Sequence, residues 1–238
     1  MRPVAQKPKE CKAEVNDIRW LTPDVIEVDL RVVEPEDFRF EAGQWVSVPF
    51  GPKDVRAWSM ASSPTRRGVI TLSVDVAPGG IGSQWLRGLS VGDAVRFKGP
   101  TGGFVFNRAD TRRPLFVAEE IGVVPIRSIL TWLYETGYGR ANGLMFWARN
   151  PSWLVYDAEF RSLARRYPSF SYFPVVREAP AGWRGEKGEV VDVVDHLVHS
   201  VDRLVVYVCG GGETINRVRD TLVRKGMDRK SVRWEKFW

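Results

Sequence analysis

The spacing of apolar residues changes near residue 110, and this change constrains the fold more than any other feature of the sequence. Before it, apolar and polar residues alternate with period two, as in Ile26–Val32 and Ile70–Val76. Such alternation predicts half-buried antiparallel strands. After it, short apolar runs alternate with segments whose apolar residues recur at helical spacing. That order predicts a mainly parallel, doubly wound sheet with helices on its faces.

The first half contains further strand-like segments separated by turns rich in glycine and proline. They are Trp45–Phe50, Val55–Ala61 and Asp93–Lys98, and one helix is expected at Ser83–Leu89. Five or six short strands with one helix predict a small barrel or sandwich. We therefore expect a polar tail over residues 1–10, an antiparallel domain over 11–109 and an α/β domain over 110–238, with the junction at Arg108–Arg113.

In the second half, five strands and four helices are expected in alternation. The strands are Pro114–Ala118, Leu144–Ala148, Phe170–Val176, Leu204–Cys209 and Ser231–Phe237. The helices centre on residues 126–133, 160–167, 190–197 and 215–222, and Lys225-Gly226 is a typical helix end. Ligands of such sheets bind beyond the carboxyl ends of the strands.

Composition excludes several classes of protein. The chain has 238 residues, of which 44% are hydrophobic and 27% charged, as expected for one or two globular domains. No apolar run approaches the roughly 18 residues of a membrane helix. The N-terminus resembles no signal peptide, which predicts a cytoplasmic protein. Two cysteines cannot form a disulfide framework or a four-thiolate iron–sulfur cluster, and His196 and His199 have no third ligand nearby, so no metal site is expected.

The net charge of +6 suits an acidic protein partner or a nucleic acid. No run of five like charges occurs, which argues against a nucleic-acid-binding arm.

Two segments of the first half have the residues of an anion site. A strand with Arg56, Trp58 and Ser59 offers a guanidinium for a phosphate and an indole for a planar ring. Gly79-Gly80-Ile81-Gly82-Ser83 leads into the expected helix with Ser83 as its cap, and free N–H groups at such a helix start attract anions. Each segment alone also fits an ordinary edge strand or hairpin turn.

These two segments occur in this order and are followed by Gly99-Pro100-Thr101-Gly102-Gly103-Phe104. With this combination of motifs, the sequence resembles the ferredoxin–NADP reductase superfamily over nearly the whole chain. The resemblance implies a six-stranded Greek-key barrel that binds FAD, with FMN less favoured, and Ser59 beside the flavin N5. The flavin-binding residues that it implies are Arg56, Ala57, Trp58, Ser59, Gly80, Gly82, Ser83 and the C-terminal aromatic Trp238, with Phe237 as the alternative aromatic.

The segment after the first strand of the second half departs from the family. It keeps Gly122 and Pro125, which the resemblance assigns to nicotinamide-nucleotide binding, but has Glu119, Glu120 and Ile121 where relatives have Gly-Gly-Thr. A carboxylate about 4 Å from a phosphate costs roughly 1 kcal/mol in water and 4 kcal/mol at an effective dielectric of 20. Side chains that point to solvent have little effect, and the sequence leaves both cases open.

A second glycine-rich turn, Cys209-Gly210-Gly211-Gly212, resembles the segment that lies near the reactive nicotinamide carbon in relatives. The resemblance assigns Cys209, Gly210 and Gly211 to the nucleotide, and Cys209 and Glu235 together with Ser59 to catalysis. Arg149 and Arg177 follow the second and third strands and are candidates for a ribose or a 2′-phosphate, so the choice between NADH and NADPH stays open.

The resemblance implies an NAD(P)H-dependent flavin oxidoreductase without an iron–sulfur domain of its own. Hydride passes from NAD(P)H to FAD, and single electrons pass to a separate acceptor, such as an acidic ferredoxin steered by the positive charge. The alternative is a flavoprotein electron-transfer subunit whose nicotinamide site Glu119 and Glu120 have closed.

Overall fold

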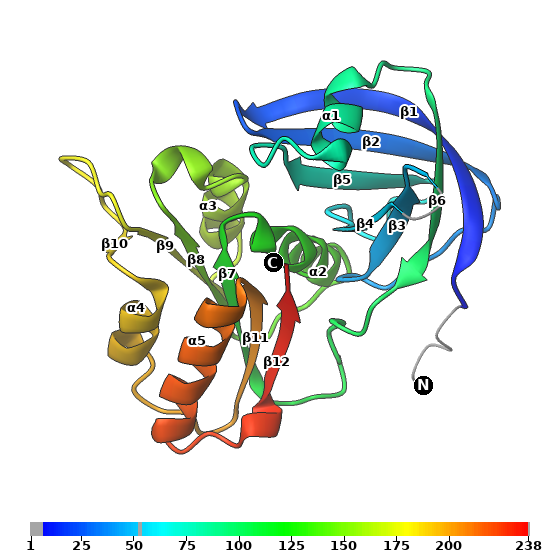
Figure 1. Cartoon of the computed structure of the whole chain (residues 1–238). Coiled ribbons are helices and arrows are strands. Elements are labelled where there is room, and N and C mark those ends of the chain that lie inside the picture. Colours follow the sequence, from blue (N-terminus) through cyan, green and yellow to red (C-terminus); the bar gives the residue numbers. More distant parts are fainter. Residues whose placement is uncertain (1–6, 52–53, 238) are drawn as a thin grey trace. The chain divides into compact units, whose positions relative to one another are not determined.

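The computed structural model describes residues 7–51 and 54–237 and divides into two compact units (Figure 1). The first unit comprises the chain up to Phe106 together with Val124–Gly137. The second comprises Asn107–Val123 and the chain from Tyr138 onward. The chain thus returns once to the first unit before it completes the second.

The first unit is built on an antiparallel sheet of six strands in the order β4-β3-β6-β1-β2-β5. The strands are β1 (Lys9–Thr22), β2 (Val25–Glu34), β3 (Trp45–Pro49), β4 (Val55–Ser59), β5 (Val69–Asp75) and β6 (Ala94–Thr101). A bridge between Met60 and Leu72 connects the chain after β4 to β5, so the two edge strands of the sheet meet. The expected antiparallel six-stranded architecture is therefore confirmed.

Strand β1 was not expected from the sequence, although it is the longest strand. Its inward residues Cys11, Ala13 and Val15 are small, so their alternation is a weak signal. Beyond Val15, the pairing with β2 shifts register, which breaks the period of two. Both effects hide a strand from a search for strict alternation.

The core of the first unit consists of the inward-facing side chains of all its strands except β4, with Met60 and Leu86 added. Leu86 lies on α1 (Ile81–Gly88), which begins two residues earlier than expected. Its N-cap is Gly80, without a side-chain hydrogen bond, and Ser83 is buried inside the helix. The prediction that Ser83 caps this helix is therefore wrong, because the helix already begins after Gly80 and includes both Gly82 and Ser83.

Helix α2 (Val123–Glu135) anchors the chain that follows β4. The Ser128 hydroxyl donates to the Ser62 carbonyl at 2.6 Å, and the Arg127 guanidinium donates to the Ala61 carbonyl at 3.0 Å. These bonds hold the segment Ala61–Ser62 against a rigid element.

The second unit is a parallel sheet of six strands in the order β10-β9-β8-β7-β11-β12. The strands are β7 (Arg113–Glu119), β8 (Asn142–Ala148), β9 (Phe170–Val176), β10 (Glu186–Lys187), β11 (Leu204–Gly210) and β12 (Val232–Lys236). The helices of this unit are α3 (Asp157–Arg166), α4 (Val190–Leu197) and α5 (Gly212–Arg224), with short 3-10 turns at Glu120–Gly122, Pro151–Trp153 and Arg229–Ser231. The doubly wound sheet expected from the sequence is confirmed.

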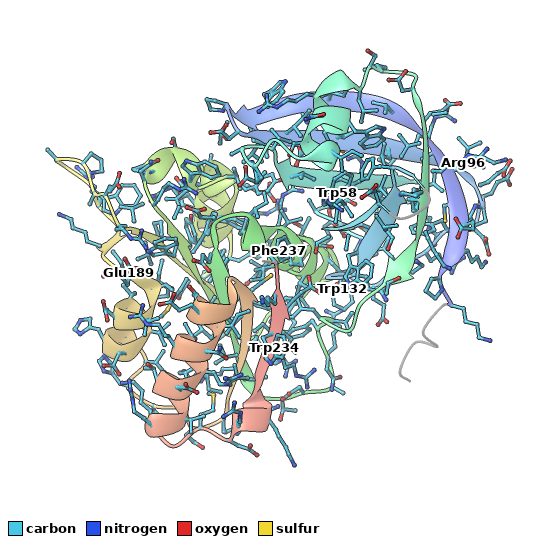
Figure 2. The ribbon with its side chains drawn as sticks, viewed as in Figure 1. Trp58, Arg96, Trp132, Glu189, Trp234 and Phe237 are labelled. Carbon is cyan, nitrogen blue, oxygen red and sulfur yellow. The ribbon has the colours of Figure 1, made fainter. Side chains whose placement is uncertain are left out.

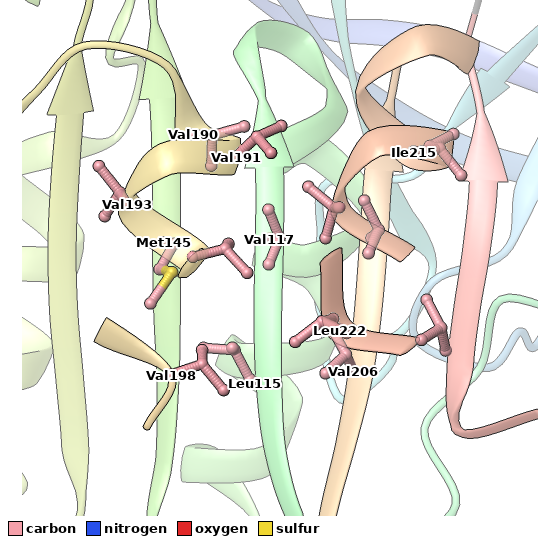
Figure 3. Close-up of a cluster of buried hydrophobic side chains, with 14 of the residues drawn as sticks. Leu115, Val117, Met145, Val190, Val191, Val193, Val198, Val206, Ile215 and Leu222 are labelled. Atoms are coloured by element: carbon pink, nitrogen blue, oxygen red, sulfur yellow. The ribbon is translucent and has the colours of Figure 1, made fainter. Parts of the chain in front are cut away.

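Valines from α4 pack with Ile215, Val218 and Leu222 of α5 on one face of this sheet, over Val117 of β7 (Figure 3). On the other face, the ring of Phe160 of α3 contacts Phe146 of β8. Helix α5 ends at the expected position, where Gly226 has a φ of 94°. In the described part of the chain, no helix is both long and apolar enough to span a membrane.

Candidate flavin and nucleotide sites

Strand β4 presents the residues expected to bind the flavin. Arg56 and Ala57 are exposed, Trp58 is half-buried and Ser59 is buried. Ala57 pairs with Ser47 of β3, and Ser59 pairs with Trp45. Burial therefore increases along the strand, from a charged exposed end to a buried hydroxyl.

The glycine-rich turn before α1 lies directly against this strand. A Cβ atom on Gly82 would come within 3.1 Å of the Trp58 ring and 3.3 Å of the Arg56 Cγ. Both distances are shorter than is usual for a Cβ atom, so a larger residue here would require the Trp58 or Arg56 side chain to shift slightly. The structure thus brings Arg56, Trp58 and Gly82 together, although the first two lie more than twenty positions before the third.

The charges around the start of α1 favour an anion. The helix has no side-chain cap and no acidic residue in its first turn. The Arg56 guanidinium donates to the neutral carbonyl of Val55 at 3.0 Å, and no carboxylate of the described residues forms an ion pair with it. Free N–H groups, the helix dipole and a guanidinium together fit a phosphate. The residues present therefore fit the phosphate groups of a flavin nucleotide.

Trp58 belongs to an aromatic group with Phe50 and Trp85. Its ring stacks on Trp85 with centroids 5.9 Å apart and an angle of 23°, and Phe50 meets both rings edge-on. Figure 2 labels Trp58 in the first unit. The sequence suggested Trp58 alone, whereas the structure shows this ring packed against Trp85 of α1 and Phe50.

In the second unit, the residues expected near the nicotinamide gather at the carboxyl ends of β7, β11 and β12. Cys209 is fully buried and is the register partner of Glu235 on β12. A Cβ atom on Gly122 would come within 2.4 Å of the Cys209 carbonyl oxygen, so the turn after β7 packs directly on the end of β11. Pro125 lies in the first turn of α2, within the segment Val124–Gly137 that belongs to the first unit.

Glu119 extends from the end of β7 to the start of α5. Its Oε2 accepts a hydrogen bond from the Gly211 amide at 2.7 Å. Gly211 is the N-cap residue and supplies no side-chain cap of its own. A Cβ atom on Gly210 would lie 2.6 Å from this same oxygen. The Glu119 carboxylate therefore occupies the end of the helix that the sequence left available for a phosphate.

Glu120 has a different partner. It adopts a φ of 45°, the left-handed conformation in which glycine is usual, and is almost fully buried. Arg149 forms a two-point ion pair with it, with Nε to Oε1 at 2.7 Å and Nη2 to Oε2 at 2.8 Å. The guanidinium also covers the ring of Trp153 at 4.2 Å. Both glutamates therefore have partners within the protein, and of the two cases that the sequence left open, side chains that point freely to solvent are not observed.

The remaining candidates have mixed outcomes. Arg177 pairs with Glu189 and covers the Trp147 ring, so both candidate arginines contact carboxylates of their own unit. Phe237 follows β12, and its amide donates to the Gly210 carbonyl at 3.1 Å (Figure 2). Trp238 lies outside the described residues. Among the described residues, no group of three side chains has the composition of a metal site.

The pKa of the Cys209 thiol lies well above its usual value. Burial is the main cause, and the negative charges of Glu235 and Glu119 act in the same direction. The thiol is therefore uncharged at neutral pH.

Both halves of the chain match family models. Residues 12–106 match the oxidoreductase FAD-binding domain, and residues 116–220 match the oxidoreductase NAD-binding domain. The chain is 30% identical over 236 residues to ferredoxin–NADP reductase B of Sorangium cellulosum, covering 95% of this chain and 97% of that protein. The chain belongs to the ferredoxin–NADP reductase superfamily and is an FAD-dependent, NAD(P)-linked oxidoreductase.

Other relatives are longer. The reductase component of propane 2-monooxygenase from Rhodococcus jostii is 28% identical over 96% of this chain, which spans 64% of that protein. A crystal structure of an Amycolatopsis cytochrome P450 reductase superimposes with a TM-score of 0.89 at 26% identity, over 98% of this chain and 71% of that one. The matched regions include both units in each case.

Proposed function

We propose that this chain oxidises NAD(P)H at its second domain, over residues 110–238, and delivers the electrons through FAD held by residues 11–109. When bound, FAD accepts a hydride and releases electrons singly, the chemistry that connects a nicotinamide donor to a one-electron acceptor. The observation that carries the proposal is the approach of Gly82 to Arg56 and Trp58 beside an uncapped helix start.

Individual side chains have separate roles in this proposal. Arg56, with Gly80, Gly82 and Ser83, holds the flavin phosphates. Trp58, which stacks on Trp85, positions the ring system. The flanking residues Ala57 and Ser59 complete the flavin-binding strand.

Ser59, which is buried, would border the reacting part of the flavin ring system. The next segment, Ala61–Ser62, is fixed by Arg127 and Ser128 of α2.

In the second domain, Gly122, Pro125, Gly210 and Gly211 shape the nucleotide site, and Cys209 and Glu235 border the nicotinamide. The start of α5 does not fit a phosphate as built, because Glu119 already accepts the Gly211 amide. The phosphates of the nucleotide must therefore find their partners elsewhere in this domain.

The acceptor in this proposal is a separate, acidic one-electron carrier protein. Several relatives are named as reductase components of oxygenase systems, and the net charge of +6 favours association with an acidic surface. The free, buried thiols of Cys11 and Cys209 agree with a reducing compartment such as the cytoplasm. Transfer to an acidic carrier should slow as ionic strength rises, because salt screens attraction between surfaces.

An anaerobic titration tests the proposal. FAD-loaded protein is mixed with NADH and then with NADPH while the flavin absorbance is followed. Bleaching at micromolar reductant supports an NAD(P)H oxidoreductase and identifies the preferred donor. Absence of bleaching with both nucleotides, in protein whose flavin dithionite still reduces, refutes it.

Absence of bleaching with both nucleotides would favour the alternative function, an electron-transfer subunit that exchanges electrons only with protein partners. The bond between Glu119 and the Gly211 amide favours this alternative, because it occupies a helix start beside Cys209. A protein donor that reduces the flavin when neither nucleotide does would then be the decisive observation.

A further inference from the structure

The two glutamates that replace glycines differ in their net electrostatic effect. Glu120 is matched by the guanidinium of Arg149, so the pair is close to neutral when seen from a distance. Glu119 is hydrogen-bonded to the Gly211 amide, which is a dipole and not a cation. Among the described residues, Glu119 therefore has no such two-point ion pair, although the positive charge of Arg177 acts on it.

The position of Glu119 is also fixed. Its Cβ and Oε2 atoms each lie 2.6 Å from the point where a Cβ atom on Gly210 would stand, so the side chain fills the space above the glycine turn. A phosphate that approached the first turn of α5 would meet both this charge and an amide already in use. The same charge raises the pKa of the neighbouring Cys209 thiol, after burial and Glu235.

We propose that Glu119 is a specificity-determining residue: its carboxylate serves as an internal anion that keeps nucleotide phosphates away from the start of α5. The second domain then accepts a nicotinamide dinucleotide only in an arrangement whose phosphates avoid this turn. The inference rests on the proposed function, since it takes a nicotinamide dinucleotide as the ligand of this domain.

The test compares two glutamates on the same helix start. Glu119→Gln removes the charge and keeps an oxygen that accepts the Gly211 amide, so α5 keeps its cap. Glu213→Gln removes an equal charge from the first turn of α5, where the side chain is 85% exposed. Isothermal titration calorimetry of the FAD-loaded proteins with NAD⁺ measures binding without reducing the flavin.

We expect Glu119→Gln to bind NAD⁺ about tenfold more tightly than the unmodified protein, and Glu213→Gln to change the Kd by less than about twofold, because solvent screens its charge. Inorganic pyrophosphate should compete with NAD⁺ more effectively in Glu119→Gln. Equal Kd values for the two variants, or weaker binding in Glu119→Gln, would overturn the proposal.

Glu119→Gly provides a second variant with the family's residue, should the glutamine disturb packing over Gly210. It should also bind NAD⁺ more tightly, and unchanged affinity in both variants would contradict the inference. If no variant is reduced by NADH or NADPH although binding differs as expected, the proposed function fails while the role of Glu119 stands.

Discussion

The molecule contains two glycine-rich turns that lead into helices, and their electrostatic surroundings differ. The turn before α1 has no side-chain cap and lies against Arg56. The turn before α5 is occupied by the carboxylate of Glu119, has Glu213 in its first helical turn, and has the Lys236 Nζ 3.6 Å from the position of a Cβ atom on Gly212. One turn is suited to receive a phosphate, and the other already contains an anion.

This difference shows that glycines before a helix specify only a shape. They allow close approach and expose amide groups, which any anion can use, including a side chain from a distant strand. The two turns differ in the strand that lies beside each of them and in the charge that this strand carries. At α1 it is strand β4 with a cation, and at α5 it is the end of β7 with a carboxylate.

The largest expected effect is at the turn before α1. Arg56→Ala should weaken FAD binding by about 10- to 150-fold, since a hydrogen bond to a charged group contributes about 1.5–3 kcal/mol. Arg87→Ala is the matched control, because Arg87 lies on α1 but covers the ring of Trp20. Fluorescence titration of the apoprotein with FAD measures both. Equal losses of FAD affinity in the two variants would contradict the binding of an FAD phosphate at this turn.

A somewhat smaller effect is expected from filling the space between the turn and the strand. Gly82→Val places atoms against Trp58 and Arg56, and overpacking of this kind costs about 1–3 kcal/mol. Gly88→Val introduces the same side chain on the same helix, where a Cβ atom meets nothing within 4 Å. Urea denaturation and FAD content after gel filtration should separate the variants. If both retain FAD and stability equally, the close approach has no functional value.

The sequence predicted most of the fold because its two periodicities are strong and the turns between them carry glycine and proline. It missed β1, whose inward side chains are small and whose register shifts after Val15. It also misplaced the start of α1, since a serine after glycines resembles an N-cap, whereas here Gly80 takes that position and Ser83 is buried.

The candidate site was predictable where it depends on local order along the chain, as with Arg56, Trp58 and Gly82. The partners of Glu119 and Glu120 were not, because Gly211 and Arg149 lie far away in sequence. Only the parallel order of β8, β7 and β11 brings the ends of these segments to one edge of the sheet. The contribution of α2 to the segment after β4 was equally hidden, since Ser128 and Ser62 are 66 residues apart.

The smallest expected effect concerns the pH dependence of stability and tests the turn before α5. The pKa of Cys209 is raised in the folded protein, so the folded state retains a proton that the unfolded chain releases near its ordinary value of 9.0. Stability from this group is therefore complete below about pH 9 and declines as pH rises above it, by up to about 1.4 kcal/mol per pH unit.

Urea midpoints at pH 8 and pH 10 measure this decline, and Cys209→Ala should lessen it. Cys11, whose pKa is also raised, to about 11, contributes equally to both proteins and cancels from the difference. Because Glu119 is one of the charges that raise the pKa of Cys209, Glu119→Gln should reduce the decline part of the way. A decline that Cys209→Ala leaves unchanged would mean that the thiol does not experience the charges of this turn, and the contrast with the turn before α1 would then rest on the Gly211 hydrogen bond alone.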